Sequence, residues 1–168
     1  MPELPDAELY KRYFDSTALH QLITDVAVVE PSLLDGVSTN TLQGALHGSS
    51  FEKGRRHGKH LFARLSTDRR LGLHFGMSGE LTYYKRGDAP VYTYFRIDFD
   101  NGYHLALVTP RKLGHVRLLD DPDALIAEKE LGPDALGLDV ETLEAQLDGR
   151  RGMIKNALMN QTGIAGLG

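Results

Sequence analysis

The chain of 168 residues contains no cysteine. It therefore forms no disulfide and offers no thiolate ligand to a metal ion. It also has no apolar run long enough to cross a bilayer, and no secretory signal precedes the first helical pattern. Because its 41% hydrophobic and 25% charged residues are ordinary for a soluble globular protein, we expect a cytoplasmic protein that does not enter a membrane.

Basic residues are concentrated in one block of an otherwise acidic chain. The formal net charge is −4, yet positions 50–117 hold 13 Lys/Arg and 6 Asp/Glu, against 2 and 7 before them and 4 and 10 after them. A basic surface is typical of proteins that bind a polyanion. An unevenly charged, solvated surface explains the same counts, and the charge pattern alone leaves both interpretations open.

The first 119 residues mix helical and strand patterns. Apolar spacing predicts a helix from Asp6, as N-cap, to about Leu19, and another over Thr41–Leu46 with Thr39 or Asn40 as its cap. The predicted strands are Leu22–Val29, Lys59–Leu65, Tyr92–Phe99 and Tyr103–Val108, with a hairpin turn at Asn101-Gly102. Short strands separated by turns indicate a sandwich or a barrel.

The pattern becomes helical after Leu119. We expect helices over Pro122–Lys129, Val140–Leu147 and Met153–Met159, and Asp121 and Asp139 are plausible N-caps of the first two. This change predicts two domains, residues 1–120 and residues 121–168.

The segment Met1-Pro2-Glu3 carries unusual chemistry for a chain start. Removal of Met1 would leave a secondary amine on Pro2, and an α-amino group, with a pKa of about 7.7–8.0, is a usable nucleophile near neutral pH. Glu3 could move protons for the same centre. Pro5 stiffens the segment. On Pro2 and Glu3 alone, a disordered terminus with chance prolines is the favoured interpretation, because chain termini are usually poorly ordered.

Six motifs resemble one family in order along the chain. They are Met1-Pro2-Glu3-Leu4-Pro5-Asp6-Ala7-Glu8, Gly54-Arg55-Arg56-His57-Gly58-Lys59, His74-Phe75-Gly76-Met77-Ser78-Gly79, Pro110-Arg111-Lys112-Leu113-Gly114, Leu131-Gly132-Pro133-Asp134 and Ile154-Lys155-Asn156-Ala157-Leu158-Met159-Asn160-Gln161. The family is the formamidopyrimidine-DNA glycosylases, the Fpg/Nei base-excision enzymes. The resemblance covers essentially the whole chain.

The resemblance implies an α+β fold that is mainly β. Residues 1–120 would form the catalytic β-sandwich flanked by helices, and residues 121–168 the first part of an all-α helix–two-turn–helix domain. The family usually continues with another helix and a four-cysteine zinc finger, so we expect no cofactor in this chain and any zinc beyond Gly168. We also expect the chain to be a fragment that is weak or inactive alone, and the full-length protein to be monomeric.

The resemblance also implies an activity and a partner. The partner would be double-stranded DNA with a damaged base, from which oxidised bases of the formamidopyrimidine and 8-oxoguanine type are removed. Pro2 would be the nucleophile that forms an iminium with the sugar, Glu3 would move protons, and Lys59 would contact a phosphate near the damaged nucleotide. Strand cleavage by AP-lyase chemistry would follow.

Four further residues would contact DNA by the same resemblance. Met77, Arg111 and Leu113 would fill the gap left by the flipped nucleotide, with Arg111 on the opposite base. Lys155 would lie on the first helix of the helix–two-turn–helix element. Leu113 stands where the bacterial 8-oxoguanine enzymes typically have Phe, and Asp6 stands where the family usually has Glu.

Other interpretations stay open. A catalytically inactive DNA-binding module of the same fold would keep Lys59, Met77 and Arg111, and a β-sandwich interaction domain would need none of them. The Gly54–Lys59 run fails the phosphate-loop pattern. His57 and His60 are three apart, a spacing that puts side chains on opposite faces of a strand, so we expect no metal site.

Overall fold

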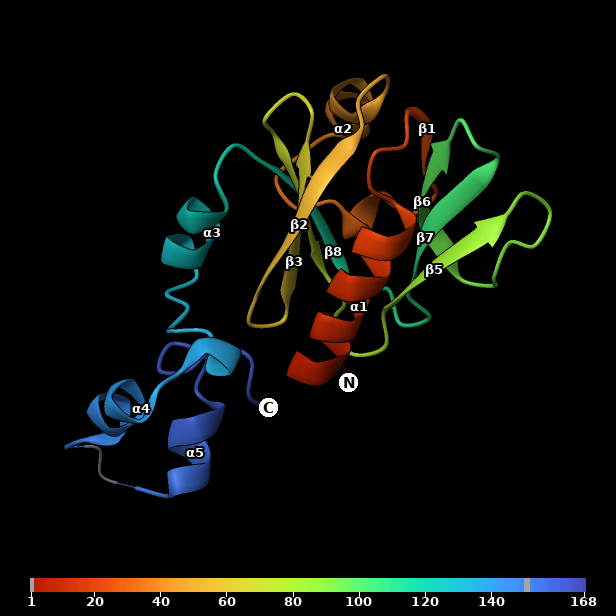
Figure 1. The fold of residues 1–168 in the computed structure, drawn as a ribbon. Helices are drawn as coiled ribbons and strands as arrows, with labels where there is room; N and C mark the ends of the chain where they lie inside the picture. Colours follow the sequence, from red (N-terminus) through yellow and green to blue (C-terminus); the bar gives the residue numbers. More distant parts are fainter. Residues whose placement is uncertain (1, 150–151) are drawn as a thin grey trace.

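Two antiparallel four-stranded sheets form the main body of the protein in the computed structural model, which describes residues 2–149 and 152–168 (Figure 1). One sheet has the order β1-β6-β7-β5 and the other β2-β3-β4-β8. The strands are β1 Ile23–Val28, β2 Phe51–His57, β3 His60–Leu65, β4 Arg70–His74, β5 Glu80–Lys85, β6 Thr93–Phe99, β7 Tyr103–Val108 and β8 His115–Leu119. The helices are α1 Leu4–Thr17, α2 Thr39–Leu46, α3 Pro122–Glu128, α4 Val140–Leu147 and α5 Ile154–Met159, with short 3-10 turns at Pro31–Leu33 and Ala135–Gly137. The expected α+β class is confirmed.

The core lies between the two sheets and under α1. Alternate residues of β6 and β7 point inward, and the same period places the apolar residues of β3 and β4 opposite them. Phe51 of β2 is fully buried, with its ring centroid 5.0 Å from that of Phe14 on α1 and 6.5 Å from that of Phe99 on β6. Helix α1 is therefore fixed by its own buried face against both sheets.

The caps of the first two helices differ from the prediction. Glu3, not Asp6, is the N-cap of α1; the Glu3 backbone N–H donates to Asp6 Oδ2 at 2.8 Å, and the Glu3 side chain accepts from the Asp6 backbone. Ser38, rather than Thr39 or Asn40, caps α2. The prediction erred because Pro5 is tolerated in the first turn of a helix, so α1 begins earlier than the apolar pattern suggests.

The helical segment after β8 begins as the sequence predicts, with Asp121 capping α3 and Asp139 capping α4. The chain then returns toward its own start: Ala165 pairs with Asp134, and Gly166 and Gly168 lie against Leu4 and Glu3. Figure 1 shows the C-terminus close to the lower end of α1. A domain boundary near residue 120 stays a prediction. Met1, whose removal would free the nitrogen of Pro2, lies outside the described residues. No helix in the described ranges is long and apolar enough to span a membrane.

The basic block does not form one positive stripe. Its 13 Lys/Arg lie on strands of both sheets and the loops between them. Eight of them form ion pairs with Asp or Glu; these are Arg55, Arg56, Lys59, Arg64, Arg69, Arg96, Lys112 and Arg117. The charge count of the sequence therefore overstates the free positive surface.

Three histidines form a row on the outer face of the second sheet. His60 pairs with His74 across β3 and β4, with ring centroids 4.7 Å apart, and His74 pairs with His115 on β8. Burial, and then the neighbouring positive groups, lower the pKa of His60 to about 3 and that of His74 to about 4. In the described part of the chain, no group of three or more His, Asp or Glu is placed to hold a metal ion.

The spacing argument for His57 was wrong about geometry. His57 and His60 are direct partners across the turn that joins β2 and β3, so they share a face of the sheet. A three-residue spacing separates faces only within one continuous strand, and here the chain reverses at Gly58-Lys59.

The histidine row predicts loss of stability in weak acid. His60 and His74 have folded pKa values far below 6.5, so the unfolded chain binds more protons as the pH falls below 6.5, and the free energy of unfolding falls with it. As the pH falls from 7 to 5, each of the two imidazoles should lower the free energy of unfolding by about 1–2 kcal/mol. Urea unfolding at both pH values should show that a His60→Gln/His74→Gln variant loses most of this dependence, whereas replacement of the exposed His47 by Gln leaves it unchanged. An equal pH dependence in all three proteins would contradict this assignment.

Candidate active site and nucleic-acid interface

The first candidate residues meet at the start of α1. Pro2 and Glu3 are half-buried, and Lys59 Nζ lies 2.6 Å from Glu3 Oε2. Lys59 comes from the turn between β2 and β3, so residues 56 positions apart share one site. The structure thus places the Lys59 ammonium beside the carboxylate that directly follows Pro2. A carboxylate and an ammonium group next to a proline that would become an amine on removal of Met1 suit nucleophilic and proton-transfer chemistry.

The turn that presents Lys59 is held by Asp134. Gly58 has φ +55, a left-handed conformation that glycine adopts without strain, and its N–H donates to Asp134 Oδ2 at 2.6 Å. Arg56 Nη1 donates to the Gly58 carbonyl oxygen at 2.8 Å. A Cβ on Gly58 would lie 3.1 Å from the Cβ of Ala165, so the turn also fits closely against the returning C-terminal segment.

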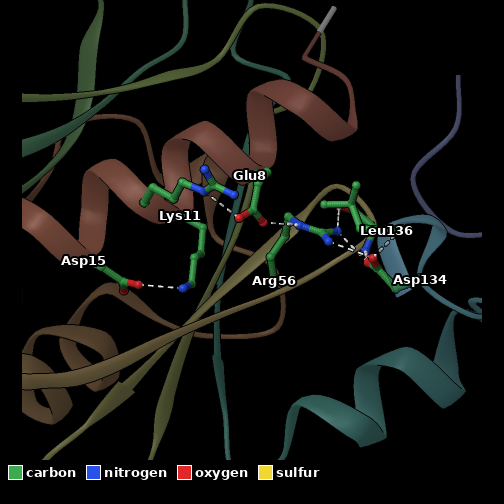
Figure 2. A network of polar contacts seen from close by, with 8 residues as sticks. Glu8, Lys11, Asp15, Arg56, Asp134 and Leu136 are labelled. Carbon is green, nitrogen blue, oxygen red and sulfur yellow. Dashed lines mark hydrogen bonds and ion pairs between the residues drawn. The ribbon is translucent and has the colours of Figure 1, made fainter. Parts of the chain in front are cut away.

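The Arg56 guanidinium joins three parts of the chain (Figure 2). Its Nε donates to Glu8 Oε2 at 3.0 Å, while Nη1 and Nη2 bind the two oxygens of Asp134 at 2.5 Å and 2.7 Å. The Arg56 side chain is only 7% exposed. Burial opposes ionisation of Asp134, but its hydrogen bonds from Arg56, Gly58 and Leu136 outweigh burial and hold its pKa below the usual value. Glu8 belongs to α1, so this network fixes the site's carboxylate and its lysine relative to each other.

The sequence prediction missed the role of this network. Arg56 and Asp134 both stand in motifs that carry the family resemblance, but Arg56 was taken only as part of a basic hairpin. The two residues are 78 positions apart, and neither local period nor spacing links them. The burial of Arg56 between two acids becomes evident only in the folded structure, which brings the three residues together.

Two loops bring Met77, Arg111 and Leu113 together. Gly76 has φ +60, and a Cβ there would overlap the carbonyl of Leu113, so the backbones of the loops after β4 and β7 are in direct contact. Arg111 Nη1 lies 3.8 Å from Met77 Sδ. Met77 and Leu113 are each 44% exposed, although both are large apolar side chains. Exposed apolar side chains beside an arginine suit insertion into a partner rather than packing within the protein.

The loop that carries Arg111 and Leu113 is itself braced. Lys112 has φ +52, its Nζ lies 2.5 Å from Glu30 Oε2, and it stands 4.9 Å above the centre of the Tyr94 ring. These contacts turn Lys112 back toward the protein and leave its two neighbours exposed.

Lys155 is not joined to this site. It is exposed on α5 and, among the residues that the structure describes, forms no ion pair with the other candidates. The predicted DNA contact at Lys155 stays a prediction.

Comparisons with known proteins identify the family of this chain. Residues 1–116 match the family model of the formamidopyrimidine-DNA glycosylase N-terminal domain. The chain belongs to the formamidopyrimidine-DNA glycosylase family. The family predicted from the sequence motifs is thereby confirmed.

Relatives of this family are matched along the whole chain. A formamidopyrimidine-DNA glycosylase of Arabidopsis thaliana is 30% identical over 100% of this chain and 47% of its own length, and one of Acidiphilium cryptum is 33% identical over 100% and 62%. The chain thus spans between about half and just under two thirds of the length of these relatives.

Solved structures of the family share the fold. Lactococcus lactis Fpg bound non-covalently to DNA containing an AP site has a TM-score of 0.89 and 26% identity, covering 99% of this chain and 64% of that one. The same enzyme in complex with DNA containing N7-benzyl-Fapy-dG gives the same score and identity, with 63% of that chain covered.

The buried network predicts unequal effects for two neighbouring Arg–Asp pairs. Asp134→Ala should lower the free energy of unfolding by about 2–4 kcal/mol, because it leaves a buried Arg56 with only one acid. Asp123→Ala should cost far less, because its pair with Arg55 is exposed on both sides. Urea unfolding of the two variants measures the difference, and equal losses would show that Asp134 is no more important than a surface acid.

The backbone contact at Gly76 predicts a loop-specific effect. Gly76→Ala should lower the free energy of unfolding by about 3 kcal/mol, because the new methyl group must push the Leu113 carbonyl away. Gly36 has a similar φ of +70 with open space around it, so Gly36→Ala should cost only about 1 kcal/mol. Thermal unfolding of both variants tests this, and matching losses would mean that φ alone, rather than loop contact, makes glycine necessary.

Proposed function

We propose that the protein to which this chain belongs is a DNA glycosylase of base excision repair that removes oxidised bases from duplex DNA. The observation that carries the proposal is the meeting of Pro2, Glu3 and Lys59 at the start of α1. Family membership and the DNA-bound relatives from Lactococcus lactis support it.

The proposed chemistry begins with the nitrogen of Pro2 once Met1 is removed. This secondary amine attacks C1′ of the damaged nucleotide, the bond from C1′ to the base breaks, and the departing base takes the bonding electrons and a proton. Glu3 supplies protons to the sugar and removes them later. Pro2 nitrogen then loses its proton, and its electron pair expels O4′, which takes a proton from Glu3, so that the C1′–O4′ bond breaks and the sugar ring opens. The resulting iminium between Pro2 and the ring-opened sugar is positively charged. It accepts the electron pair of the C2′–H bond when that proton is removed, and the 3′ phosphate then leaves with the electrons of its C3′–O bond.

Lys59 has two successive partners in this scheme. Without DNA its ammonium neutralises Glu3 at 2.6 Å. A phosphate oxygen of bound DNA then competes for the same ammonium, and Lys59 holds the strand in place. Glu3 is left free to exchange protons with the sugar, so substrate binding itself prepares the carboxylate for catalysis.

Met77, Arg111 and Leu113 occupy the space vacated by the flipped nucleotide. The two apolar side chains fill the gap in the base stack, and the Arg111 guanidinium donates to the orphaned base. Leu113 fills space without the flat ring of Phe and stacks less well on a base, so opposite-base preference depends mainly on Arg111.

A strand-cleavage assay of the full-length protein tests the proposal. On a duplex with one oxidised purine, the protein with a free Pro2 should release the base and cut the strand. A protein with an uncleavable N-terminal extension should bind an abasic-analogue duplex about equally well and cut nothing, because its proline nitrogen is an amide. Cutting by the extended protein at the normal rate would refute the role of Pro2, and binding without cleavage by both proteins would identify an inactive DNA-binding module.

Lys59 and Arg111 should affect DNA binding in different ways. Lys59→Ala should lower the slope of log binding constant against log salt concentration by about one unit, which corresponds to one lost phosphate contact. It should have little effect on base preference. Arg111→Ala should instead blunt discrimination among opposite bases by about 1–3 kcal/mol. Fluorescence anisotropy over a salt series and over four opposite bases measures both quantities.

Lys53→Ala is the matched control for this pair, because Lys53 is exposed on β2 and forms no ion pair in the described ranges. It should change neither the salt slope nor base preference. Identical behaviour of Lys59→Ala and Arg111→Ala would contradict the two assigned roles.

A further inference from the structure

A pocket lies on the outer face of the β1-β6-β7-β5 sheet, away from the candidate active site. It has a volume of about 330 Å³. Tyr84 of β5, Arg96 and Asp98 of β6, and His104 of β7 form its floor, while loop residues around Arg86 form part of its rim. β5 starts beside the Met77 loop and ends at this pocket, so the two sites lie at opposite ends of the strand.

The floor of the pocket is a fixed polar network around Asp98. Arg96 Nε and Nη2 donate to the two oxygens of Asp98 at 2.6 Å and 2.9 Å, and His104 Nδ1 lies 2.6 Å from Asp98 Oδ1. Because Nδ1 of His104 faces a carboxylate, we assign a proton to this nitrogen, which then donates to Asp98. Both oxygens of Asp98 are thus bound within the floor, and Nη1 of Arg96 has no carboxylate partner.

Two further donors in the pocket lack partners. Tyr84 is 8% exposed, and its buried hydroxyl faces Arg96 without a hydrogen bond of good geometry in the described part of the chain. A buried hydroxyl without a partner destabilises the protein unless a ligand or water supplies one. The side chain of Arg86 is exposed and has no ion pair with any described residue.

We propose that this pocket binds the terminal phosphate of a small phosphorylated molecule. Tyr84, Arg86 and Arg96 donate to the phosphate oxygens, which matches the preference of arginine for phosphate. A terminal phosphate offers three free oxygens to these three side chains, whereas an internal phosphodiester of DNA offers two. The pocket therefore favours a free phosphate or a monoester over the nucleic-acid backbone.

The size of the pocket agrees with a small ligand. A volume of 330 Å³ is at the lower end of the roughly 300–1,000 Å³ typical of small-molecule sites. Ala89, Gly87 and Gly102 leave room beside the polar floor for the rest of a small ligand, such as the nucleoside of a nucleotide. The inference does not depend on whether the protein excises bases.

Isothermal titration calorimetry of the full-length protein tests this inference, with inorganic phosphate and a nucleoside 5′-monophosphate as probes. Both should bind, and the unphosphorylated nucleoside should not. Tyr84→Phe and Arg86→Gln should each weaken phosphate binding about tenfold. Lys85→Gln removes the same charge from the adjacent exposed residue, which does not line the pocket, and should change the affinity less than about twofold.

Three outcomes would overturn the inference. The first is that the unaltered protein does not bind phosphate. The second is that Tyr84→Phe and Arg86→Gln bind phosphate as tightly as the unaltered protein, and the third is that acetate binds as tightly as phosphate. Competition by an oligonucleotide without terminal phosphates, lost in Arg86→Gln, would also overturn it by assigning the pocket to the DNA backbone. Arg86 is an exposed loop residue, so its variant decides the question even if Tyr84→Phe perturbs folding.

Discussion

The position of the buried Arg56 guanidinium is the constraint on which the candidate active site depends. It contacts Glu8 on the helix that begins at the proposed nucleophile, the carbonyl of Gly58 in the turn that presents Lys59, and Asp134 in the returning segment. Because arginine stays charged at any physiological pH, these contacts do not vary with protonation of the guanidinium. An arginine without both acids would be a buried, unpaired charge, so the three segments must assemble together.

Close backbone approach positions the loops that carry Met77 and Leu113, as Arg56 positions Glu3 and Lys59. Gly76 lets one loop touch the carbonyl of Leu113 in another, and the exposed Met77 and Leu113 are held there on a rigid frame. Rigid presentation matters because a side chain that fills a gap in DNA gains little if it must first be ordered. Keeping these two apolar side chains exposed to water lowers the stability of the free protein. A bound partner would cover them.

Turns and helix caps could be predicted from the sequence, because they depend on residues that lie close together along the chain. The turn at Asn101-Gly102 and the caps Asp121 and Asp139 follow from residue preferences within a few positions, and the structure has them where expected. The pairing of Arg56 with Asp134, 78 residues away, has no local signature. The histidine row was missed for the same reason, since cross-strand neighbours depend on sheet register rather than on spacing along the chain.

The central claim is that the amine of Pro2 performs the chemistry while the nearby Lys59 only holds DNA. Two amines at one site make this directly measurable: borohydride reduction of the full-length protein on abasic-site DNA, followed by peptide mapping of the trapped adduct by mass spectrometry. The account predicts that the sugar remnant is found on the N-terminal peptide at Pro2. An adduct on Lys59, or on any other lysine, would contradict it.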